Sequence, residues 1–202
     1  MKCCIAALLL SCLTAGAKEP EAPLRVVVYL QSGGVWLPGA ALGSAKSQAS
    51  RLFLAEGISL EWRDCKPPKS TTDEEVVVAV SFRMSTPSEF ERNDRAEALA
   101  VTYPYGKGPL TVMVFADRVA RYLTQFHGNE PAKVLGHILA HEIGHAIEGV
   151  ARHSDAGLMK PRWNWQDLLE IRGNGLHFAP QDRDLLMQRF LPDRAAATPA
   201  SL

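Results

Sequence analysis

Cysteine is scarce in the part of the chain that can fold into a domain. Three of the four cysteines fall within the first 12 residues, and Cys65 stands alone after them. A single cysteine cannot form an internal disulfide, so the small disulfide-stapled secreted folds are excluded. We interpret Cys65 as an ordinary small residue, buried or partly exposed, in preference to a residue with a role in latency or dimerisation.

Long apolar runs are also missing. The most apolar stretch, residues 3–13, is too short to cross a bilayer, which takes about 20 residues. It follows a basic start and precedes the small residues Ala-Gly-Ala at 15–17, so residues 1–17 are predicted to be a secretory signal peptide. The sequence Leu-Leu-Ser-Cys at 9–12 resembles a lipobox and leaves open a lipid anchor through Cys12. Both alternatives predict an extracytoplasmic protein, secreted, periplasmic or lipid-anchored, without a transmembrane span.

The chain carries no excess charge and no internal repeat. It has 22 basic and 22 acidic residues, and loss of Lys2 with the leader changes the balance by one unit. A near-neutral surface argues against nucleic acid as the main partner. The length that remains suits one core, so residues 18–202 are predicted to form a single domain with an N-terminal subdomain at 18–149 and a C-terminal subdomain at 150–202.

One motif is present that carries specific chemistry. Residues 141–145 read His-Glu-Ile-Gly-His, within a predicted helix capped by Asn129 and stopped by Gly149. On a helix, side chains four residues apart share one face, with Cβ atoms about 5–6 Å apart. His141 and His145 can therefore bind one zinc ion, and the neighbouring Glu142 can act as a general base on the water that zinc activates.

A third ligand is expected farther along the chain. A catalytic zinc site takes three protein ligands and keeps one position for water. Gly149 can turn the chain out of the helix, and His153 is then placed to return to the metal. Met159 lies in a turn of small residues and would form a hydrophobic floor under the histidines.

These features together resemble the metzincin zinc endopeptidases. The resemblance implies that His141, His145 and His153 bind Zn²⁺, that Glu142 is the general base, and that Met159 is the Met-turn residue. It departs from the family pattern H-E-x-x-H-x-x-G-x-x-H at two points. The glycine comes one residue late and the third histidine two residues late, a loop extension that costs little free energy.

The order of predicted elements indicates an α+β fold. It is β-α-β-β-β-β-α-α, with the motif helix last, which suits a twisted mixed β-sheet with packed helices. Helices at 164–171 and 180–190 predict a small, mostly helical C-terminal subdomain. The resemblance implies a zincin-like fold whose edge strand, predicted at 96–103, lines the substrate cleft and pairs with an extended peptide. The other predicted strands are 25–30, 58–62, 75–82 and 110–116, and the other predicted helices are 38–56 and 117–126.

The function that the resemblance implies is a secreted zinc-dependent endopeptidase acting on peptide or protein substrates. Trp163 and Trp165 follow Met159, where the family builds the pocket for the substrate side chain just past the scissile bond. They are either part of that wall or ordinary core aromatics.

Other assignments remain open from the sequence. An acidic residue such as Glu170 is an alternative third ligand. His137 lies one turn before the motif. It either hydrogen-bonds to a metal ligand, is itself an alternative ligand, or, in the interpretation that we prefer, is a non-catalytic histidine. Asp155 either orients a ligand imidazole or is a turn residue. The non-enzyme alternative is a catalytically weak or inactive zinc-stabilised extracellular binding protein.

Overall fold

The structure is a computed structural model, and it describes residues 23–31, 39–72, 75–91, 97–104, 108–127 and 130–191. The predicted signal peptide with Cys12 and the predicted helix cap Asn129 lie outside the described residues. Cys65 is described; it is a free thiol, exposed after the second strand.

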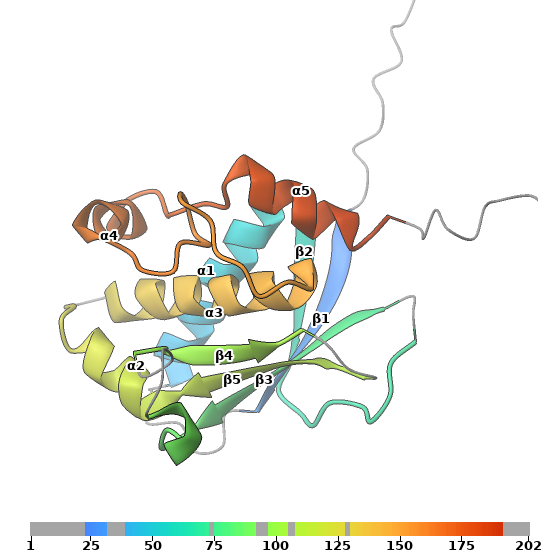
Figure 1. The fold of residues 1–202 in the computed structure, drawn as a ribbon, viewed down its shortest axis with the longest axis horizontal. Helices are drawn as coiled ribbons and strands as arrows, with labels where there is room; N and C mark the ends of the chain where they lie inside the picture. The colour runs from blue at the N-terminus through green and yellow to red at the C-terminus, as the bar shows by residue number, and fades with distance from the viewer. Residues whose placement is uncertain are drawn as a thin grey trace, which may run out of the picture.

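The described part of the chain contains a mixed five-stranded sheet in the order β2-β1-β3-β5-β4 (Figure 1). Strands β2, β1, β3 and β5 run parallel to one another, and β4 runs antiparallel to β5. The interior strand β1 buries five consecutive residues, as expected for a parallel strand covered on both faces. The bounds are Leu24–Gln31 for β1, Ile58–Arg63 for β2, Val76–Arg83 for β3, Ala100–Tyr103 for β4 and Leu110–Phe115 for β5. The predicted α+β class is confirmed.

Two long helices pack together on one face of this sheet. They are α1, Gly39–Ala55, and α3, Glu130–Glu148, which carries the histidine motif. Gly136 lies where α3 crosses α1, and a Cβ there would stand 2.5 Å from the Cβ of Gln48. Residues 134–140 of α3 are all buried, so this helix is the centre of the hydrophobic core.

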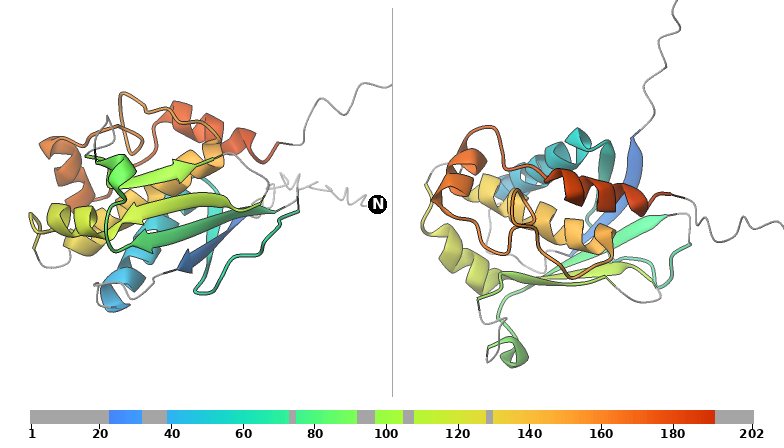
Figure 2. Two further views of the ribbon diagram at one scale, coloured as in Figure 1. Left: turned by 60° about the horizontal axis from the view of Figure 1, so that its bottom comes forward. Right: turned by 45° about the horizontal axis from the view of Figure 1, so that its top comes forward.

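Shorter helices complete the molecule (Figure 2). Helix α2, Ala116–Leu123, follows β5, while α4, Trp165–Arg172, and α5, Pro180–Gln188, contact α3 from the side away from the sheet. The segment between α3 and α4 has no regular secondary structure. Both predicted C-terminal helices are present; the division into subdomains stays a prediction. Within the described residues, no helix combines the length and the hydrophobicity that a membrane crossing requires.

The predicted edge strand is at the edge of the sheet, but it is shorter than predicted. Strand β4 begins at Ala100, four residues after the predicted start. The carbonyl of Ala98 accepts a hydrogen bond of 2.8 Å from the guanidinium of Arg118, which also donates to the carbonyl of Phe90. The carbonyl of Leu99 still accepts a hydrogen bond of 2.9 Å from the N–H of Phe115, at the end of β5. Ala98, one residue earlier, is held by a side chain of α2 instead.

The close crossing at Gly136 makes a testable prediction. Gly136→Ala should lower the free energy of unfolding by about 1–3 kcal/mol, because the added methyl group meets Gln48 and the backbone of Ala45. Gly43→Ala is the matched control: a Cβ at this α1 position meets nothing within 4 Å, so helix propensity should make it neutral or stabilising by up to about 1 kcal/mol. Chemical denaturation of both variants measures the difference. Equal stabilities would show that α1 and α3 do not cross closely at this point.

Candidate metal centre

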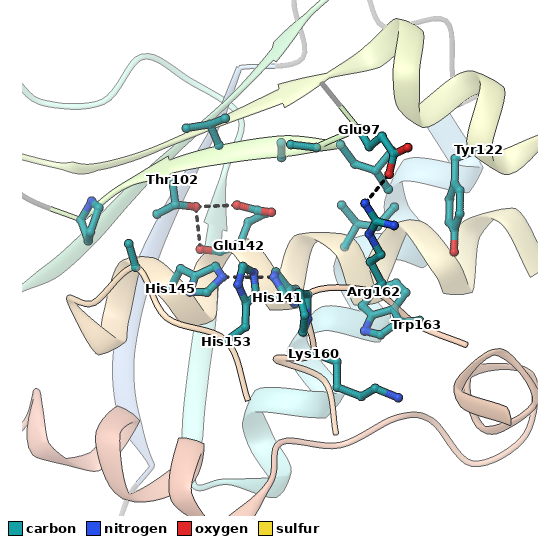
Figure 3. A pocket seen from close by; sticks show the side chains of 18 of the residues that line it. Glu97, Thr102, Tyr122, His141, Glu142, His145, His153, Lys160, Arg162 and Trp163 are labelled. Atoms are coloured by element: carbon teal, nitrogen blue, oxygen red, sulfur yellow. Dashed lines mark hydrogen bonds and ion pairs between the residues drawn. The ribbon is translucent and has the colours of Figure 1, made fainter. Parts of the chain in front are cut away.

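The structure brings three histidines together. His141 and His145 lie one turn apart on the helix, and His153 reaches them from the segment that follows Gly149, which has a φ of +69°. One ring nitrogen of each lies within 4.8 Å of the other two, and the rings face one another (Figure 3). Within the described part of the chain, these histidines are the one set of three or more His, Cys, Asp or Glu side chains that lie close enough together to bind a metal ion.

The nitrogen geometry fits a tetrahedral metal. The Nε2 atoms of His141 and His145 are 3.1 Å apart. Two nitrogens bound to one zinc at 2.0–2.1 Å would be about 3.3 Å apart. Nδ1 of His141 lies 2.8 Å from the carbonyl oxygen of Leu158, which only accepts, so Nδ1 carries the proton and Nε2 keeps its lone pair.

The environment also keeps these rings neutral. Burial lowers the pKa of His141 below its usual value, against a hydrogen bond to Leu158 and the charge of Asp182. Burial, with the neighbouring His141 and His153, lowers the pKa of His145 to about 3. The pKa of the more exposed His153 is lowered mainly by burial. At neutral pH the group therefore offers unprotonated imidazole nitrogens, the form that metals bind.

Glu142 lies beside the cluster and is held from the sheet. The hydroxyl of Thr102, on β4, lies 2.6 Å from its Oε2 and 3.1 Å from its backbone carbonyl. Burial raises the pKa of Glu142 to about 7, although the Thr102 hydrogen bond and the charge of His153 act in the opposite direction. A carboxyl group with this pKa is suited to accept and return a proton near neutral pH. Thr102 was missed by sequence reasoning because its contact spans 40 positions.

Met159 packs directly beneath the motif. Its side chain is 1% exposed, and its Sδ would lie 2.9 Å from a Cβ placed on Gly144, between the two helical histidines. The turn around it is closed by a hydrogen bond from the Lys160 N–H to the carbonyl of Gly157, which has a φ of +72°. The predicted position of Met159 under the histidines agrees with this contact, while the Met-turn assignment itself stays a prediction.

A cavity of about 730 Å³ opens over the cluster, between β4 and the segment that follows His153. Trp163 lines it, and its indole N–H donates to the Leu158 carbonyl at 3.1 Å. An ion pair of 2.6 Å between Glu97 and Arg162 joins the two sides of the cavity (Figure 3). Trp165, also in the described part of the chain, is 68% exposed as the first residue of α4 and is not part of the lining. Of the two tryptophans, only Trp163 lines this cavity, and its assignment to a substrate pocket stays a prediction.

The alternative ligands lie elsewhere. Glu170 is on the exposed side of α4, beside Gly173 in a second hollow. Asp155 is exposed, and the outward nitrogen of His141 is bonded to a backbone carbonyl and not to a carboxylate.

His137 has a structural role. Its ring is completely buried, and its Nδ1 lies 2.7 Å from the carbonyl of Lys133 and its Nε2 3.1 Å from the N–H of Leu176. The ring must therefore donate through Nδ1 and accept through Nε2, which leaves no lone pair for a metal. His137 fastens α3 to the chain that precedes α5.

Comparison with known proteins supports the fold. No family model and no curated protein sequence matches the chain. Its structure is similar to that of a zinc-dependent peptidase from Methanocorpusculum labreanum strain Z, with a TM-score of 0.52, 13% identity, and coverage of 80% of this chain and 99% of that one. It is also similar to an archaemetzincin from Methanopyrus kandleri, with a TM-score of 0.50, 14% identity, and coverage of 85% and 98%. The zincin-like fold predicted from the sequence is thereby confirmed.

Burial of His137 predicts a specific loss of stability in acid. Burial lowers its pKa to about 4, against about 6.5 in an unfolded chain. The unfolded state therefore binds more protons between these values, and the free energy of unfolding falls as the pH falls through this window. Between pH 7.5 and 5 the wild-type protein should lose about 2 kcal/mol more than His137→Gln, which has no titrating ring. Denaturant titrations at the two pH values measure this difference.

The control for this comparison is His127→Gln, since His127 is exposed. It should follow the wild-type pH dependence. If His137→Gln did the same, the buried ring would not be the source of the acid sensitivity.

Proposed function

We propose that this protein is a zinc-dependent peptidase that cleaves peptide bonds within extended substrates. The observation that carries the proposal is the convergence of three neutral imidazoles next to the partly buried carboxyl group of Glu142, in a cavity bordered by an edge strand. Likeness to the fold of a zinc-dependent peptidase and of an archaemetzincin supports it. His141, His145 and His153 would hold the metal, with Met159 as the Met-turn residue.

The chemistry divides between the metal and the protein. Zinc bound by the three imidazoles would supply a Lewis acid that polarises the scissile carbonyl and acidifies a water molecule. Glu142 takes the proton from that water and later delivers it to the leaving amine. Thr102 holds the carboxyl group of Glu142 in position for both transfers. No serine or cysteine nucleophile is required, so no acyl-enzyme forms.

The cavity suits a polypeptide substrate. Strand β4 pairs with β5 on one side, and its other edge borders the cavity. An extended peptide can bind along that edge through main-chain hydrogen bonds. Trp163 would contact the side chain just past the scissile bond. We further propose that the protein acts outside the cytoplasm, either secreted, periplasmic or anchored by lipid at Cys12.

Metal content separates the proposed ligand set from its alternative. His153→Ala should weaken zinc binding by more than about 100-fold, because loss of even an indirect partner of a ligand costs 10–100-fold. Glu170→Ala should bind zinc as the wild type does, since Glu170 lies on the exposed side of α4. Metal analysis and competition with a chelator measure both. The reverse result would replace His153 by Glu170 in the site.

Turnover tests the role of Glu142. Glu142→Gln should bind zinc with near wild-type affinity, yet kcat should fall by at least about 10²–10⁴-fold, because an amide cannot accept the proton. Glu170→Gln removes an equivalent charge far from the cluster and should be fully active. The assay is cleavage of a mixed-peptide library, followed by mass spectrometry with and without a chelator.

Two outcomes would contradict this proposal. Normal cleavage by Glu142→Gln would rule out its role as general base. A wild-type protein that binds zinc but cleaves no peptide would favour the zinc-stabilised binding protein instead.

A further inference from the structure

A completely buried carboxylate contacts the two residues that flank the third histidine. Asp182, in the first turn of α5, is 0% exposed. Its Oδ1 accepts a hydrogen bond of 3.0 Å from the guanidinium of Arg152 and a second one from the hydroxyl of Ser154. Its Oδ2 accepts from the N–H of Ala179 at 3.2 Å. A buried charge is tolerated when several donors compensate it, and here three do so.

The two oxygens of Asp182 serve different segments. Oδ2 binds the residue before α5 and so closes the start of its own helix, a local role common at this helix position. Oδ1 binds side chains 28 and 30 positions earlier in the chain. A helix cap needs only the Oδ2 contact to Ala179, so the Oδ1 contacts require another explanation.

The residues bound by Oδ1 are the two direct neighbours of His153. Residues 151–154 have no helix or strand, so regular backbone hydrogen bonds do not fix the direction of the His153 ring. The side chains of Arg152 and Ser154 converge on one buried oxygen and also bond to each other at 3.1 Å. The N–H of Ser154 donates to the carbonyl of Met159 at 2.9 Å, which joins the same segment to the turn under the cluster.

We propose that Asp182 is the positioning residue for His153: by holding Arg152 and Ser154 it sets the direction in which the third imidazole reaches the metal. The proposal rests on the proposed function in taking His153 as a ligand. Asp182 acts through the backbone of residues 152–154 and does not contact the metal or the substrate.

The first test is Asp182→Asn, in the full chain loaded with zinc or with cobalt(II). The amide loses the charge that binds Arg152, so zinc affinity measured by chelator competition should fall by about 10–100-fold. The visible absorption spectrum of the cobalt form should change, because it reports coordination geometry and not overall stability. Asp184→Asn is the matched control, with the same charge change at an exposed site on the same helix.

The second test separates positioning from helix capping. Ser154→Ala leaves the contact between Asp182 and Ala179 intact but removes one of the two links to the His153 segment. It should weaken zinc binding by about tenfold and alter the cobalt spectrum, whereas a capping role alone predicts no change in either. This variant decides the matter if Asp182→Asn does not fold.

Wild-type zinc affinity and a wild-type cobalt spectrum in Ser154→Ala would overturn the positioning role. That failure is distinct from failure of the proposed function. If His153→Ala lowers zinc affinity while Ser154→Ala does not, the ligand set stands and only the role of Asp182 is lost. If His153→Ala binds zinc normally, the proposed centre is wrong and so is the inference.

Discussion

The carbonyl oxygen of Leu158 is the contact on which the site depends. It accepts the Nδ1–H of His141 at 2.8 Å and the indole N–H of Trp163 at 3.1 Å. The N–H of the same residue donates to the carbonyl of His177 at 2.7 Å. The backbone of this one buried residue thus sets the tautomer of a proposed ligand, positions an aromatic wall of the cavity, and ties the turn to the chain before α5.

Helix α3 places several polar side chains inside the hydrophobic core, and these need hydrogen-bond partners. The helix runs through the hydrophobic core, yet it carries His137, His141, Glu142 and His145, whose burial without partners would cost free energy. Partners for most of them come from other elements: Leu158 for His141, Thr102 for Glu142, and Leu176 for His137. These polar side chains are tolerated in the core because the loops and the edge strand provide hydrogen-bond partners for them.

Some parts of the fold were predictable because the signal is local. The spacing of His141 and His145 and the helix around them follow from helical periodicity, and the order of strands and helices predicted the mixed sheet. The start of β4 was not predictable, since the carbonyl of Ala98 is taken by Arg118, 20 positions away. Trp165 was misplaced for a related reason: the capping box formed by Asn164 and Asp167 starts α4 at this residue and leaves its side chain in solvent.

The sequence by itself determined the kind of chemistry: the donor types, the helix that presents two of them, and the glycine that lets the chain return with a third. These are properties of neighbouring residues, governed by backbone geometry and side-chain type. Only the tertiary structure decided the rest, namely that Thr102 binds Glu142, that Asp182 holds both neighbours of His153, and that His137 is bonded on both sides. Such pairings join positions that are about 30–40 residues apart, and no periodic pattern specifies a long-range contact until the core has packed.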